Sequence, residues 1–149
     1  MNNHKVLMMI IIDAENMIVG RVAVAAAQQA LLNEKVLVVN CEKAIISGSK
    51  EFVFAKYKQK YDRGVPKKGP FIPRMPDRFF RRIIRGMLPM AGARGREAFK
   101  RVMCYLGVPE EAKGKETFKV AGADAKKLPT MKFVVLGDLC TQLGSSWNK

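Results

Sequence analysis

Residues 7–39 read LMMIIIDAENMIVGRVAVAAAQQALLNEKVLVV, and this stretch decides the fold. Residues 7–12 form a short apolar run, which is typical of a strand buried on both faces of a parallel sheet. Residues 20–32 are rich in alanine and contain no proline, which favours a helix lying close to that sheet. Residues 36–39 are apolar and mostly β-branched, which predicts a second buried strand. The stretch therefore has the length and pattern of a βαβ unit with a right-handed crossover.

The next segment combines a predicted helix with a long loop. Residues 51–60 suit a helix in which Phe52, Ala55 and Gln59 share one face. Residues 61–76 contain two glycines and four prolines, which exclude regular structure. A loop of this length inside a compact domain is usually functional.

Two further helices follow the loop. Asp77 is a plausible N-cap for the first, which ends at Pro89 and carries two stripes at helical spacing. The apolar stripe comprises Phe80, Ile83, Ile84, Met87 and Leu88. The basic stripe comprises Arg78, Arg81, Arg82 and Arg85. The second predicted helix is marked by Phe99, Val102, Met103 and Leu106. Short strands over 118–120 and 132–136, then a short helix over 138–143, complete the chain.

Composition limits the class of protein. The chain has 149 residues, 48% of them hydrophobic, so it suits a single domain with a real core. Its net charge of +14 indicates a polyanionic partner. Sixteen of the 27 basic residues, but only four of the 13 acidic ones, lie in residues 50–101. Such a concentrated excess is what a phosphate-binding surface requires.

Membrane and secretory classes are excluded by pattern. The longest apolar run spans seven residues, 6–12, whereas a membrane-spanning helix needs about 18. Charged residues interrupt the segment before residues 25–27, so we expect no signal peptide. Cys41, Cys104 and Cys140 are odd in number and far apart, which predicts buried free thiols in a reducing compartment.

Enzymatic motifs are weak. Asp13 and Glu15 follow the first strand, but no other ligands accompany them, so we expect a structural role at the strand end and helix cap. No glycine-rich dinucleotide motif follows that strand. Residues 47–50, SGSK, match a phosphate loop poorly and suit a turn and helix start. His4, the sole histidine, cannot support a catalytic triad by itself.

The basic region predicts binding to nucleic acid. Arginine dominates the stripe on the predicted helix, and guanidinium groups bind phosphate through two hydrogen bonds. The adjoining region carries Tyr57, Tyr61 and Phe71, aromatic residues able to pack on sugar or base. A mode that combines shape and phosphate contact suits RNA. An α/β enzyme that uses a nucleotide is the alternative, and a basic protein of the membrane surface is a second one.

Four motifs, in order along the chain, resemble one known family. Residues 74–89 read RMPDRFFRRIIRGMLP, which is similar to the signature of the universal large-subunit ribosomal protein numbered thirteen. Residues 13–14 with 20–21, and 38–44 with 47–48, resemble that family's opening motif and second-strand segment. Residues 94–109 resemble the segment after the signature. The short connection at Asn33 and the loop before the helix resemble the archaeal and eukaryotic branch more than the bacterial one.

The resemblance implies a fold and a function. It implies a three-layer α/β/α fold with a parallel sheet of about four strands, forming one domain over 1–149 with a basic loop and helical extension. It further implies a structural constituent of the large ribosomal subunit that binds large-subunit ribosomal RNA, supports assembly and contacts neighbouring ribosomal proteins. The expected location is the ribosome in the cytoplasm. No catalytic activity, cofactor, metal, small-molecule substrate or membrane partner is expected.

The predicted RNA-binding residues rest on two grounds. Those carried over by motif are Arg21, Lys43, Lys50, Arg85, Arg94 and Arg96. Those that rest on charge and periodicity are Lys56, Lys58, Lys60, Arg63, Lys67, Lys68, Arg74, Arg78, Arg81, Arg82, Lys100 and Arg101.

Overall fold

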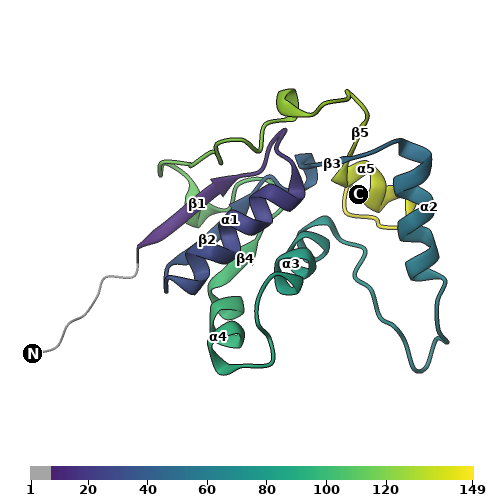
Figure 1. Ribbon diagram of the computed structural model, residues 1–149, viewed down its shortest axis with the longest axis horizontal. Helices are drawn as coiled ribbons and strands as arrows, with labels where there is room; N and C mark the ends of the chain where they lie inside the picture. The colour runs from purple at the N-terminus through teal and green to yellow at the C-terminus, as the bar shows by residue number, and fades with distance from the viewer. Residues whose placement is uncertain (1–7) are drawn as a thin grey trace, which may run out of the picture.

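A parallel three-stranded sheet lies at the centre of the fold. The computed structural model describes residues 8–149 (Figure 1). Strand β1 (Met9–Asp13), helix α1 (Val19–Leu31) and strand β2 (Lys35–Val39) form the predicted βαβ unit, with Met9 paired to Lys35 and Asp13 to Val39. Strand β4 (Val102–Cys104) pairs in parallel with the other edge of β2, so the strand order is β1-β2-β4.

Strand β4 corrects the helix predicted through residue 106. Helix α4 (Ala93–Arg101) ends where Val102 turns to extended backbone, with φ −96° and ψ 123°. The side chains of Val102 and Cys104 are buried on the sheet, and Met103 points to the other face. The prediction was wrong because a short apolar run fits helical and extended periodicity equally well. Burial beside β2 decides between them.

A smaller antiparallel sheet lies next to the main one. Strand β3 (Ile45–Ser47) pairs with β5 (Phe133–Val135), and the short helices η1 (Cys41–Lys43) and α5 (Leu136–Gln142) flank it. The predicted strand and helix near the C-terminus are thus confirmed as β5 and α5, whereas β3 was not predicted.

The predicted strand over 118–120 is reduced to one bridge. Phe118 pairs in parallel with Ile12, and its N–H donates to the Ile11 carbonyl over 2.7 Å. In the described part of the chain, the fourth position of the parallel sheet is therefore a single residue.

The two faces of the main sheet differ in their cover. Ile12, Val36 and Val38 face the large core that contains the inner sides of α1 and α3 (Pro76–Gly86). The opposite face carries Ile11, Leu37 and Val39, which pack with Tyr105 and with Ala112 of the short helix η2 (Glu110–Ala112). The fold is α/β as predicted, with a full helical layer on one face and mainly irregular chain on the other in the described residues. None of the helices described is both long and apolar enough to span a membrane.

Helix α2 (Lys50–Tyr61), which was predicted over 51–60, buries the face that carries Val53. Val53 is buried and Tyr57 and Tyr61 are half-buried, whereas Phe52 is 66% exposed. Phe52, Ala55 and Gln59 share one face of this helix, as predicted, but all three are exposed, so that face is not the buried one. Spacing of i, i+4 and i+8 places Val53, Tyr57 and Tyr61 together, and the aromatic pair offers more apolar area than Ala55 and Gln59.

Helix α3 begins earlier than predicted. Pro76 occupies its first turn and Met75 the N-cap, so Asp77 is not the N-cap; its carboxylate accepts the N–H of Arg78 over 2.8 Å. Phe80, Ile84 and Leu88 of the predicted apolar stripe are buried. Phe79 completes the buried set in place of Met87, which is 39% exposed.

The connection between α3 and α4 depends on Gly95. A Cβ atom at this position would lie 2.1 Å from the carbonyl oxygen of Pro89, which is backbone and cannot turn aside. The first turn of α4 therefore packs directly on the connection at a distance that only glycine permits.

We expect Gly95→Ala to destabilise the protein by about 2–3 kcal/mol, because the new methyl group forces the backbone apart. Gly20→Ala is the matched control: a Cβ there meets no atom within 4 Å, and a helical alanine stabilises by about 0.5–1 kcal/mol. Urea unfolding followed by circular dichroism measures both. Equal transition midpoints for the two variants would contradict this account of the connection.

The three cysteines fill the core, as predicted. Cys41 and Cys140 have no exposed surface and Cys104 is 6% exposed. Burial raises the pKa of the Cys41 thiol well above its usual range. Burial, with a smaller contribution from Asp77, raises the pKa of Cys140 to about 12. At neutral pH these two groups are therefore uncharged thiols.

We expect a disulfide reagent such as DTNB to react very slowly with the native protein at pH 8, because the attacking thiolate is both scarce and enclosed. After unfolding in guanidinium chloride, all three thiols should react within seconds to minutes. Rapid reaction of Cys41 or Cys140 in the native state would show that the core opens readily.

Candidate nucleic-acid interface

The basic region forms one side of the molecule. Helix α2, the extended segment 62–75, helix α3 and helix α4 follow each other along this side, and segment 62–75 reaches away from the sheets (Figure 1). Of the sixteen basic residues of 50–101, four lie on α3 and three more lie on the C-terminal half of α2. Basic residues that are close in the sequence over 50–101 therefore also lie on one side of the folded protein.

Arg81 points into the protein. Its Nε donates to the carbonyl of Val102 over 3.0 Å and its Nη2 to the carbonyl of Phe99 over 3.3 Å. The guanidinium carbon lies 4.0 Å from the centroid of the Phe99 ring. Arg81 therefore joins α3 to the end of α4 and the start of β4, and its charge satisfies carbonyls at a helix C-terminus.

Three contacts fix the extended segment to the helices. Arg82 of α3 donates from Nη1 to the carbonyl of Phe71 over 3.1 Å. The hydroxyl of Tyr61 donates to the carbonyl of Pro73, and Arg74 lies 5.5 Å from the centroid of the Tyr61 ring. Burial raises the pKa of Tyr61 to about 12, so this phenol remains a neutral donor among the cations.

Three more predicted site residues have protein partners. Arg101 donates to the carbonyl of Ala30 at the end of α1 over 3.4 Å and pairs with Glu97 at 3.8 Å. Arg21 donates to the carbonyl of Gly122. Lys43 pairs with Glu15 at 3.2 Å. Arg21 on α1 and Lys43 on η1 lie outside the region of α2 to α4.

The remaining thirteen predicted site residues are exposed, and none forms an ion pair with a described acidic residue. Lys56 and Lys60 lie beside the Tyr57 ring, at 5.9 and 5.1 Å from its centroid. We call these thirteen the exposed basic set. The set comprises Lys50, Lys56, Lys58, Lys60, Arg63, Lys67, Lys68, Arg74, Arg78, Arg85, Arg94, Arg96 and Lys100.

A groove of about 430 Å³ runs between α2 and α3. Tyr57, Phe79 and Ile83 contribute apolar walls, and the rings of Tyr57 and Phe79 meet edge to face at 5.0 Å. Lys60, Arg63 and Arg82 are among the other residues that line it. The basic side of the molecule is therefore furrowed, with cations beside apolar surface.

The edge of the sheet where α/β enzymes bind ligands is occupied by contacts within the protein. The Asp13 carboxylate accepts the Glu15 N–H and the Asn40 side-chain amide, both over 3.0 Å. Glu42 accepts the Gly107 N–H over 3.1 Å. The predicted structural role of Asp13 and Glu15 at the strand end is confirmed, although the N-cap of α1 is Ile18 and uses no side chain.

Residues 47–50 and His4 were the two other weak motifs, and only the first lies in the described part of the chain. Ser49 is the N-cap of α2 and accepts the Phe52 N–H over 3.4 Å, so residues 47–50 are the predicted turn and helix start. His4 lies outside the described residues.

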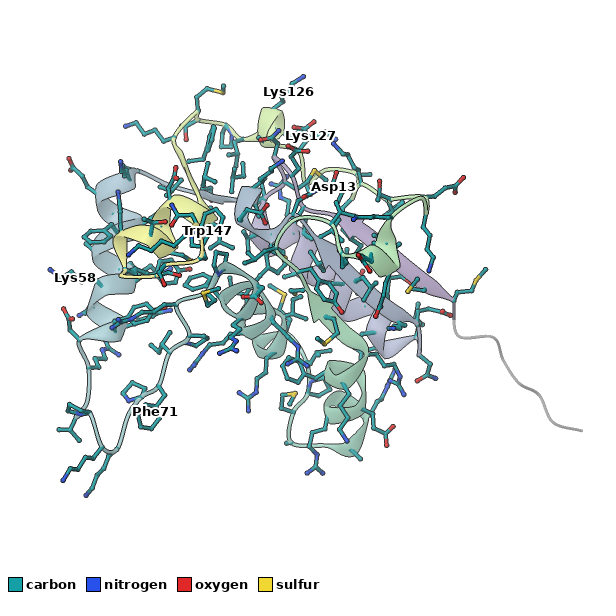
Figure 2. The ribbon with its side chains drawn as sticks, turned by 180° about the vertical axis from the view of Figure 1, so that it is seen from behind. Asp13, Lys58, Phe71, Lys126, Lys127 and Trp147 are labelled. Carbon is teal, nitrogen blue, oxygen red and sulfur yellow. The ribbon has the colours of Figure 1, made fainter. Side chains whose placement is uncertain are left out.

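Sequence reasoning left aside a second group of exposed cations. Lys126 and Lys127 of the short helix η3 (Ala125–Lys127) lie at the opposite end of the molecule from segment 62–75 (Figure 2). Lys119 and Lys132 are exposed as well. Acidic residues nearby in the sequence, such as Glu116 and Asp124, offset these positive charges. The net charge of this part of the chain is therefore small and does not indicate a basic surface.

Known proteins that are similar to this chain align with nearly its whole length. The family described as "Ribosomal protein L13" matches residues 7–111. A protein of Methanopyrus kandleri, named "Large ribosomal subunit protein uL13", is 48% identical over 136 residues, which cover 90% of this chain and 86% of the relative. The proteins of the same name from Archaeoglobus fulgidus and Haloarcula marismortui are 46% and 44% identical, covering 90% and 92% of this chain and 86% and 92% of their own.

These relatives agree with the resemblance seen in the motifs. All three come from archaea, which confirms the predicted branch. The matched range includes the βαβ unit, the basic region and strand β4. The chain belongs to the ribosomal protein L13 family.

Proposed function

We propose that this protein is a non-catalytic constituent of the large ribosomal subunit that binds large-subunit ribosomal RNA. The observation that carries the proposal is the exposed basic set, thirteen cations on and around α2 to α4 with no ion-pair partner among the described residues. Its place is in the cytoplasmic ribosome, beside neighbouring large-subunit proteins, where it supports assembly. The name shared by the relatives supports this assignment.

The arrangement of the cations supports a division of labour. Arg81, Arg82 and Arg101 hold α1, α3, α4 and segment 62–75 together through backbone carbonyls. The exposed basic set is thereby presented on a fixed frame, which lowers the entropy lost when phosphates bind. Each phosphate neutralised releases counterions, so affinity falls steeply as salt rises.

Arg78→Glu with Arg85→Glu tests the RNA-binding face. Both residues are exposed on α3, so we expect an unchanged circular-dichroism spectrum and a loss of affinity for a large-subunit ribosomal RNA transcript of at least tenfold. The plot of log affinity against log salt should become shallower by about 1.5, because two phosphate contacts are lost. Filter binding at several salt concentrations measures both quantities.

The control reverses the same amount of charge elsewhere. Lys113→Glu with Lys115→Glu changes two exposed residues just after η2, outside the basic region of residues 50–101. If both double variants lose affinity equally, net charge and not this face drives binding. In sucrose gradients of cell extract, the native protein should sediment with the large subunit through a high-salt wash; protein that stays at the top contradicts the proposal.

Arg81 should behave differently from its neighbours. We expect Arg81→Glu to lower the free energy of unfolding by about 2–4 kcal/mol, because it removes two charge-assisted hydrogen bonds and the contact with the Phe99 ring. Arg85→Glu, one turn further along, should change stability by no more than about 0.5 kcal/mol. Urea unfolding separates the two, and similar midpoints would contradict the structural role of Arg81.

A further inference from the structure

Phe71 is an apolar ring presented to solvent on the basic segment. Its residue is 71% exposed, more than any other described aromatic residue, and it lies on the part of the chain that extends from the body (Figure 2). Tyr57 and Tyr61, the other aromatic residues of this region named above, are half-buried and engaged with Phe79 and Pro73. Phe71 alone among the three is available to a partner.

The backbone that carries this ring is fixed from two sides. Arg82 donates to the carbonyl of Phe71 itself, and Tyr61 donates to the carbonyl of Pro73, two residues further on. Tyr61 belongs to α2 and Arg82 to α3, so the ring is positioned by both helices. The exposed ring contributes little apolar burial to the stability of the protein. Because the backbone beneath it is already fixed, the ring can bind a flat partner without the entropy cost of ordering a loop.

The surroundings of the ring select the kind of partner. Phe71 lines a hollow of about 450 Å³ together with Tyr61, Arg74 and Arg78. Phe71, Arg63 and Arg74 are among the residues that line a second hollow, of about 350 Å³. Asp62 is the only acidic residue that lines either of these two hollows. The site thus offers an apolar ring beside hollows that Arg63, Arg74 and Arg78 help to line.

We propose that Phe71 is a stacking platform for one unpaired base of the bound RNA, with Arg74 and Arg78 on the phosphates beside that base. A nucleotide in a single-stranded loop or bulge combines the two properties that the site demands, a flat face and adjacent negative charge. Paired bases inside an RNA helix do not expose such a face. The inference rests on the proposed function and adds to it a contact that reads an unpaired nucleotide.

Phe71→Ala, Phe71→Trp and the large-subunit ribosomal RNA transcript provide the test. We expect the alanine variant to bind about 5- to 150-fold more weakly, which is the range for loss of one stacked base, and the tryptophan variant to bind as tightly as the native protein. The slope of log affinity against log salt should stay unchanged, because no phosphate contact is lost. Ultraviolet cross-linking followed by mass spectrometry should yield a nucleotide adduct on the peptide that contains Phe71.

Phe118→Ala is the matched control, because Phe118 is 56% exposed and lies on the sheet edge far from α2 and α3 in the chain. If Phe71→Ala and Phe118→Ala both bind like the native protein while Arg78→Glu with Arg85→Glu binds weakly, the stacking inference is overturned and RNA binding stands. An effect of Phe71→Ala seen only when other ribosomal proteins are present assigns the ring to a protein contact and also overturns it. If the native protein does not bind the transcript, the proposed function fails first.

Discussion

The guanidinium group of Arg81 makes the interaction on which the geometry of the basic side depends. Two of its nitrogens donate to carbonyls where α4 ends and β4 begins, and its flat face covers the Phe99 ring. Because β4 is an edge strand of the parallel sheet, this one side chain ties α3 to the sheet as well as to α4. A cation inside the protein thereby fixes the frame from which its neighbours Arg78 and Arg85 reach solvent.

The fold was predictable from sequence where period and composition agree. The alanine-rich helix between two apolar strands could adopt few other structures, so the βαβ unit was predicted to within about two residues. Strand β4 and the buried face of α2 were not predicted. Three or four apolar residues fit both helical and extended periodicity, and only packing against β2 or α3 decides which structure forms and which face is buried. Strand β3 was missed since its partner lies almost ninety residues away, beyond any local pattern.

The candidate site shows a similar limit. Charge count located the basic side correctly, but it could not distinguish Arg81 from Arg78, which share a stripe on one helix. The difference arises because the Arg81 side chain meets Phe99 and Val102, residues brought there by the connection between α3 and α4 that packs against Gly95. The aromatic residues show the same limit. Nothing in the sequence distinguishes Tyr57, Tyr61 and Phe71, and only tertiary contacts show that the two tyrosine rings are packed and that Phe71 is exposed.

The pairing of β3 with β5 affects the order in which the parts of the protein fold. The two strands bracket the whole basic region, and Trp147 (Figure 2), beyond β5, donates from its Nε1 to the carbonyl of Gly137 over 3.0 Å. Strands β1 and β2 are joined by α1 alone, so they can pair early in folding, whereas β3 can pair only after the chain has returned across more than eighty residues. The small sheet is therefore a contact of high sequence separation that folding reaches late, and a chain cut before β5 keeps the cations of residues 50–101 but lacks the partner strand of β3.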